Sequence, residues 1–193
     1  MKKFLLFFSV CLLSGPVFAQ KGPSTPQLGT KPTPNSIAVA RVGEEVRHEL
    51  AMMPYYSVFD WIEGEVKGTD TVVLRGAVTQ PTTKSDAENR VKRVESVAKV
   101  DSQIEVLPIS PSDDAIRVAV YRALFKYDGP LFRYSTQART PIHIIVRNGR
   151  VTLKGVIADE SDKQIAYTYA RGVPNVFEVK NELTVVKDQE GKR

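Results

Sequence analysis

The residue types that do acid–base or metal chemistry are few in this chain and stand far apart. The sequence holds one cysteine, Cys11, and two histidines, His48 and His143, so it offers no Cys–His pair and no spacing typical of metal ligands. His48 lies opposite the apolar stripe of a helical pattern, where we expect it to face solvent. His143 alternates with Ile142 and Ile144, which is the pattern of a histidine packed on a strand. These positions predict no catalytic site and no bound metal or cofactor.

The carboxylates are spaced like those of solvated helix surfaces. Glu44 and Glu45 follow Arg41 at the three- and four-residue spacing of helical ion pairs. Glu160 and Asp162 begin a second helical pattern, where acidic groups stabilise the helix dipole. No glycine run precedes a helix in the manner of a phosphate-binding loop. We therefore predict that the protein is not an enzyme.

An internal repeat organises the elements that carry these residues. Residues 72–107 align without gaps to residues 151–186. The matched pairs include Leu74 with Leu153, Gly76 with Gly155, Val97 with Val176 and Ile104 with Leu183. The unit is too long for a solenoid repeat, so it indicates one small domain used twice.

Helical and strand patterns occur in the same order in both copies. The first copy shows a helix over 36–53, strands over 58–67 and 71–79, a helix opened by Pro81 and a strand near 100–106. The second shows a helix from 112 to about 127, a loop to about 140, strands over 142–146 and 151–157, a helix over 160–172 and a strand over 177–185. We predict an α+β fold of two tandem α-β-β-α-β domains, 36–107 and 112–187, each a three-stranded mixed sheet covered on one face by two helices.

The ends of the chain have the composition of targeting and spacer segments. Residues 1–19 combine a basic start, an apolar stretch and Val-Phe-Ala, which predicts a cleavable signal peptide and a periplasmic protein. Val10 before Cys11 fits a lipidation motif poorly, so we do not expect a lipid anchor. Residues 20–35 are rich in Pro, Gly and Thr and predict a disordered spacer, and 188–193 form a charged tail. Cleavage of residues 1–19 would remove Lys2 and Lys3 from the 27 basic side chains. The remaining chain would then carry a mild net charge of +3 against its 22 acidic side chains. The balance favours anionic surfaces without indicating nucleic acid.

Several short motifs, in this order, resemble the BON domain, named for bacterial osmotically inducible and nodulation proteins. They are Val-Thr-Leu-Lys-Gly at 151–155, Gly-Val-Pro-Asn-Val at 172–176 and Val-Lys-Asn-Glu-Leu-Thr-Val at 179–185. The first copy matches less fully, and Arg93 stands there where the second copy has Gly172. The resemblance covers 36–107 and 112–187. It implies a periplasmic envelope-maintenance protein without known catalysis, for which phospholipid membrane binding is the proposed domain activity.

The first helix of the second copy is the most unusual element. Its predicted core stripe is Ile116, Val120, Ala123, Leu124 and Tyr127, yet the opposite face carries Val118, Tyr121 and Phe125 between basic residues. The equivalent face in the first copy is polar. The candidate binding residues are Arg117, Val118, Tyr121, Arg122, Phe125, Lys126, Leu131, Phe132 and Arg133.

Three interpretations of this second apolar face are open. It packs against the first domain or under the following loop, it forms a homo-oligomer interface, or it enters the headgroup region of an anionic phospholipid membrane. The alternative function is a structural module whose sheet face binds another envelope protein or the cell-wall polymer. Binding to anionic lipid should weaken steeply with ionic strength, whereas a packed protein interface should not.

Overall fold

The computed structural model describes residues 34–186, so the predicted signal peptide, most of the spacer and the charged tail lie outside the described residues. The first repeat contains α1 (Pro34–Ala51), β1 (Trp61–Lys67), β2 (Thr71–Val78), α2 (Pro81–Val91) and β3 (Lys99–Val106). The second contains α3 (Pro111–Leu124), α4 (Phe132–Ser135), β4 (Ile142–Arg147), β5 (Arg150–Ile157), α5 (Glu160–Arg171) and β6 (Glu178–Val185). None of the described helices is both long enough and apolar enough to cross a membrane.

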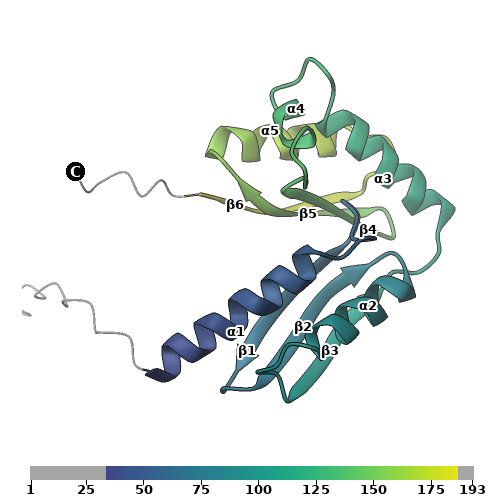
Figure 1. The fold of residues 1–193 in the computed structure, drawn as a ribbon. Helices are drawn as coiled ribbons and strands as arrows, with labels where there is room; N and C mark the ends of the chain where they lie inside the picture. The colour runs from purple at the N-terminus through teal and green to yellow at the C-terminus, as the bar shows by residue number, and fades with distance from the viewer. Residues whose placement is uncertain (1–33, 187–193) are drawn as a thin grey trace, which may run out of the picture. The chain divides into compact units, whose positions relative to one another are not determined.

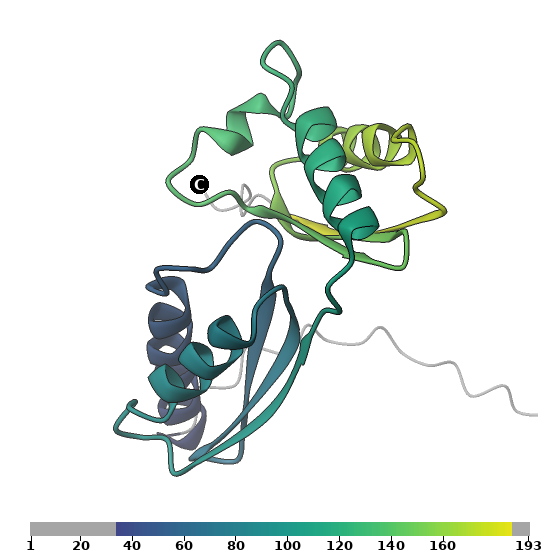
Figure 2. The same ribbon diagram turned by 90° about the vertical axis from the view of Figure 1, so that its right-hand side faces the viewer.

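Each repeat builds its own three-stranded mixed sheet. The orders are β1-β2-β3 and β4-β5-β6, with the first pair of strands antiparallel and the second pair parallel. Helices α1 and α2 lie on one face of the first sheet, and α3 and α5 lie on one face of the second (Figures 1 and 2). The predicted fold, two tandem α+β domains with mixed sheets covered on one face, is confirmed.

Apolar alternation on the strands and stripes on the helices close a core in each repeat. The first core is formed by Val42, Val46, Met53, Val72, Leu74, Val78, Ala87, Val91, Val94 and Ile104. The second core is larger and includes Ile116, Val120, Leu124, Phe125, Leu131, Ile142, Ile144, Leu153, Ala166 and Leu183. Residues 34–186 include no cysteine, so no disulfide contributes to their stability. Burial of these apolar side chains is therefore the main stabilising contribution in each domain.

A buried carboxylate fixes the start of α3 to the β4–β5 hairpin. Asn148 and Gly149 form the turn with positive φ angles of 50° and 72°, as the Asn-Gly signal predicts. Their backbone N–H groups donate to the two carboxylate oxygens of Asp113, each at 2.8 Å. Asp113 is buried, and the Ser110 hydroxyl accepts from its backbone N–H at the helix N-terminus. The Asp113 carboxylate therefore fixes the position of α3, which carries most of the candidate residues, relative to the β4–β5 hairpin.

Several predicted boundaries shift by one to three residues in the structure, and two of these shifts change how side chains pack. Residues 58–60 do not belong to β1, because the Asp60 carboxylate accepts bonds from Ser57 and Thr79 and holds this segment in a turn. Helix α3 ends at Leu124 instead of about residue 127, with Phe125 at a non-helical φ of −105° and ψ of 35°. A short helix, α4, lies inside the stretch predicted to be a loop. The second of these differences changes the candidate site.

Candidate functional site

The early end of α3 exchanges the roles of two aromatic residues. Continued helical periodicity would place Phe125 on the outer face and Tyr127 in the core. Because the chain leaves the helix at Phe125, that ring turns inward and is 7 % exposed, while Tyr127 is 84 % exposed. The prediction that Phe125 lies on the outer face is therefore wrong, and so is the prediction that Tyr127 lies in the core stripe.

Three of the nine candidate residues are buried parts of the second domain. Phe125 and Leu131 belong to its core cluster. Arg117 is also buried; it pairs with Asp114, and its Nη2 donates to the carbonyl oxygen of Val146 at 2.9 Å. This guanidinium ties α3 to the end of β4 and is not free to meet a partner.

The exposed part of α3 is a narrower strip than predicted. Val118, Tyr121 and Arg122 lie on one face at three- and four-residue spacing, and all three are exposed. Tyr121 is only 36 % exposed, because its ring packs edge-on against Phe59 of the first repeat and against Phe125, with centroids 6.2 and 5.0 Å away. The first interpretation, that this face packs inside the protein, therefore explains why Phe125 and one side of the Tyr121 ring are apolar.

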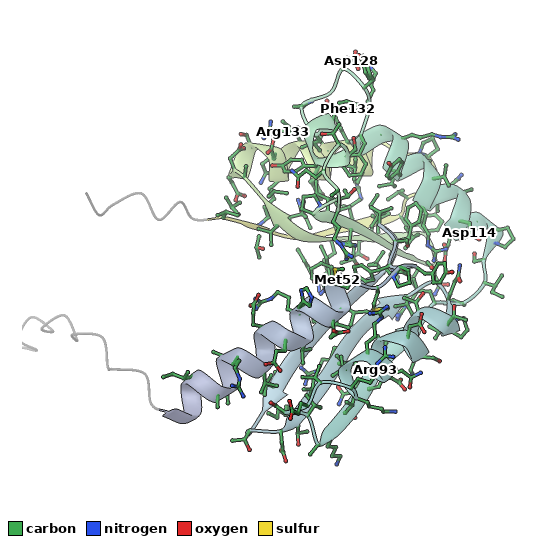
Figure 3. All side chains as sticks on the ribbon, viewed as in Figure 1. Met52, Arg93, Asp114, Asp128, Phe132 and Arg133 are labelled. Carbon is green, nitrogen blue, oxygen red and sulfur yellow. The ribbon has the colours of Figure 1, made fainter. Side chains whose placement is uncertain are left out.

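The loop between α3 and α4 continues this strip outward. Tyr127 contacts the half-buried Phe132 edge-on, with ring centroids 5.1 Å apart. Lys126 is exposed and pairs with Asp128 at 3.3 Å. Figure 3 shows Asp128 at the outer end of the loop, with Phe132 nearer the helices. An exposed tyrosine braced by a phenylalanine, with lysine beside it, therefore stands at the end of α3.

Arg133 holds the loop to the start of α5. It pairs with the buried carboxylate of Asp162 and lies 3.5 Å from that of Asp159, and the Tyr134 hydroxyl also donates to Asp162. Hydrogen bonding to Tyr134 and the nearby carboxylates raise the pKa of Arg133, and burial raises the pKa of Tyr134. At physiological pH the Arg133 guanidinium therefore stays charged and the Tyr134 hydroxyl stays neutral. Arg133 is thus engaged within the domain, although its side chain is half exposed.

We define the α3 surface as the exposed residues Val118, Tyr121, Arg122, Lys126 and Tyr127 together with the half-buried Phe132. Its chemistry is that of an adhesive surface, with aromatic rings and cations and no pair of groups set for proton transfer. Among residues 34–186, no group of three or more His, Cys, Asp or Glu side chains is placed to hold a metal ion. His48 is exposed and His143 is packed between aromatic rings, as their sequence patterns predict.

Sequence reasoning missed Tyr127 because it assumed that the helix continues. The downstream signal was Gly129-Pro130, which marks a turn but does not locate the last helical residue. The ring contacts of Tyr121 with Phe59 join residues 62 positions apart, and no periodicity reports such a pair.

Comparison with known proteins gives one informative match. The family model for the BON domain matches residues 40–108 and again 112–187. No curated protein matches the chain. Two solved structures of CdsD, a structural protein of the type III secretion system of Chlamydia trachomatis, are similar at 14 % and 13 % identity. Both cover 74 % of this chain, and 95 % and 91 % of their own, with TM-scores of 0.27 and 0.26. At these scores the likeness carries no argument about function.

Proposed function

Because the chain belongs to the BON-domain family, whose domains are envelope-associated and generally non-catalytic, we propose that it binds anionic phospholipid membranes through the α3 surface. We further propose that residues 1–19 direct it to the periplasm and that residues 36–107 and 112–187 are its two domains. The first domain serves as the scaffold and the second as the membrane-contacting part.

The observation that carries this proposal is the exposed ring of Tyr127, which packs edge-on against the half-buried Phe132. Water-exposed aromatic rings of this kind are favourable at the headgroup boundary, where the ring is buried and the hydroxyl stays hydrated. Tyr127 leaves most of its surface open, although the core of its own domain begins two residues earlier at Phe125. A tyrosine so placed is available to a partner without any rearrangement of the fold.

The charges around the pair suit an anionic surface. Arg122 lies four residues before Lys126, and among the described residues no carboxylate is within 4.0 Å of its guanidinium. Each basic residue near an anionic bilayer contributes about 1 kcal/mol, so two cations together with one inserted aromatic ring give weak, reversible binding. Asp128 opposes this attraction in part through its pair with Lys126.

Replacing Tyr127 with glutamate should abolish most binding to vesicles of phosphatidylcholine and phosphatidylglycerol. The change removes the aromatic ring and adds a negative charge at the proposed contact, and the residue is too exposed for the change to disturb the core. Vesicle flotation at low and at physiological salt measures the effect, and binding by the unaltered protein should fall steeply as salt is raised.

The matched control is Tyr55→Glu, because Tyr55 is 74 % exposed and belongs to the first repeat. This variant should float as the unaltered protein does. Equal flotation of both variants, or flotation that is insensitive to salt, would contradict the proposal. Phe125→Glu is unsuitable for this test, since it places a charge in the core and reports on folding.

The alternative, a sheet face that binds another envelope protein or a cell-wall polymer, receives less support. On the outer face of the second sheet Lys154 pairs with Glu63 and Glu182, and Arg147 pairs with Glu105 of the first repeat. These cations are already neutralised, so the face offers no obvious attraction for an acidic partner.

A further inference from the structure

A short segment of the first repeat, Ser57–Asp60, reaches into the second repeat. The carbonyl oxygen of Val58 accepts a hydrogen bond of 2.8 Å from the backbone N–H of Ile144 on β4. Strand β4 is an edge strand of its sheet, so this bond engages a backbone group that the sheet itself leaves unpaired. The side chains of Val58 and Phe59 pack against the core cluster of the second domain.

The segment keeps its shape because of one buried carboxylate. Asp60 accepts hydrogen bonds from the backbone N–H and hydroxyl of Ser57, at 3.0 and 2.7 Å, and from the same two groups of Thr79, at 2.7 and 2.9 Å. The turn is thereby fastened to the end of β2, with the side chains of Val58 and Phe59 available to the second domain.

An aromatic row connects this segment to the α3 surface. Phe59 meets Tyr121 edge-on at 6.2 Å, and Tyr121 meets Phe125 at 5.0 Å. Such edge contacts between aromatic rings stabilise a fixed ring orientation beyond the area that they bury. The position of the Tyr121 ring therefore depends on a side chain of the other domain.

His143 lies where the first repeat covers β4. Its ring is 5.3 Å from that of Tyr56 and 5.1 Å from that of Trp61, and its buried Nδ1 has no hydrogen-bond partner. Nδ1 makes no hydrogen bond in the docked arrangement, so a proton added there would be poorly compensated in this buried site. Burial lowers the pKa of His143, although hydrogen bonds to the backbone of Asp60 and Ser57 and the Asp60 charge act in the opposite direction.

Two basic side chains and a second carboxylate also lie near the ring. Lys154 is the direct cross-strand partner of His143 on β5, and Arg139 lines the same hollow between α1 and β1 as His143. Glu63 lines that hollow too but pairs with Lys154. Burial raises the pKa of Tyr56 to about 12, so it stays neutral. The Trp61 ring, which would attract an imidazolium, already has the Lys154 ammonium 5.7 Å from its centroid.

We propose that Ser57–Asp60 is an internal docking segment through which the first domain positions Tyr121 of the second, and that protonation of His143 releases it. The docked state favours neutral His143, so the released state binds a proton at a higher pH than the docked state does. Docking is therefore unaffected well above the ordinary histidine pKa near 6.5 and weakens as the pH falls below it. One proton allows at most a tenfold change in the docking equilibrium per pH unit.

Replacing Phe59 with alanine tests the docking. Hydrogen exchange of the Ile144 amide, followed by NMR on the whole protein, should speed up relative to amides in the β5–β6 ladder, and the ring resonances of Tyr121 should shift. Tyr55→Ala, an exposed aromatic four residues away, should change neither. If Phe59→Ala leaves the Ile144 protection and the Tyr121 resonances unchanged, the segment is not a docking element.

Replacing His143 with phenylalanine tests the release. In the unaltered protein the protection factor of the Ile144 amide, corrected for intrinsic exchange, should fall between pH 7.5 and pH 5 by no more than tenfold per unit. His143→Phe keeps a ring between Tyr56 and Trp61 but cannot titrate, so its protection factor should stay constant. The same fall in both proteins would overturn the role of His143.

The consequence for membrane binding rests on the proposed function, whereas the docking experiments need no membrane. If docking is shown by exchange and vesicles still bind Phe59→Ala as tightly as the unaltered protein, Tyr121 is not part of the contact and the docking proposal stands. If no vesicle binding is found for any variant, the proposed function fails and docking is judged by exchange alone.

Discussion

Replacing Gly155 with alanine should remove roughly 3 kcal/mol from the free energy of unfolding of the second domain, through backbone strain and a steric clash. Gly155 has a φ of +126°, which side chains rarely adopt, and an added Cβ would lie 1.8 Å from the carbonyl oxygen of Pro141. Backbone atoms cannot move aside as a flexible side chain can. Chemical denaturation followed by circular dichroism measures the loss.

The matched control for this change is Gly172→Ala. Gly172 has a helical φ of −75°, and the nearest atom to an added Cβ is 3.5 Å away, so alanine fits there without cost. A loss below about 1 kcal/mol for Gly155→Ala would mean that the β4–β5 pair relaxes more freely than packed backbone usually does. The same geometry recurs at Gly76, where the added Cβ would lie 1.9 Å from the carbonyl oxygen of Trp61.

Replacing Asp60 with asparagine should destabilise the first domain by roughly 3 kcal/mol, because hydrogen bonds to a buried charged group contribute about 1.5–3 kcal/mol each. The carboxylate of Asp60 is 1 % exposed and accepts four hydrogen bonds, two on each oxygen. An amide has only one acceptor oxygen, so its NH2 group would face two donors from either Ser57 or Thr79. Thermal and denaturant unfolding report the loss.

Asp70→Asn is the control for this variant. The side chain of Asp70 is exposed and accepts one long hydrogen bond of 3.3 Å from the Thr71 hydroxyl, which an asparagine oxygen can still accept. The backbone carbonyl of Asp70, which accepts from Ala98 and Lys99, is unchanged by the substitution. Because Asp60 also shapes the docking segment, Asp60→Asn should in addition speed exchange at the Ile144 amide. If Asp60→Asn is as stable as Asp70→Asn, the prediction is wrong, and water has replaced the lost acceptor oxygen.

The sequence predicted the fold well because the fold depends on local periodicity and on the repeat. Val72, Leu74 and Val78 alternate along β2 and lie in the core of the first domain, and Gly76 with Gly155 marks the same strained position in both copies. The difference between Arg93 and Gly172 also has an explanation: Gly172 has a right-handed φ of −75°, which any residue can adopt, so this position does not require glycine. Two such copies contain enough information for the α-β-β-α-β order and the mixed sheets.

The candidate site was predicted less well because it depends on where a helix stops. Nothing in the periodicity of 116–127 distinguishes a helix that ends at Leu124 from one that continues, and two or three residues decide whether Phe125 or Tyr127 faces solvent. A basic residue on a helix also looks the same in sequence whether it is free, as Arg122, or buried against a carbonyl, as Arg117.

By itself the sequence determined two domains of one family, their elements, and a second domain whose first helix is unusually apolar, aromatic and basic. Those properties follow from contacts between residues near in the chain or related by the repeat. The tertiary structure alone decided that Tyr127 is exposed while Phe125 is buried, that Arg133 is engaged by Asp162 and that Phe59 of one domain supports Tyr121 of the other. Such contacts join distant residues, and their energies depend on burial and geometry that no local pattern records.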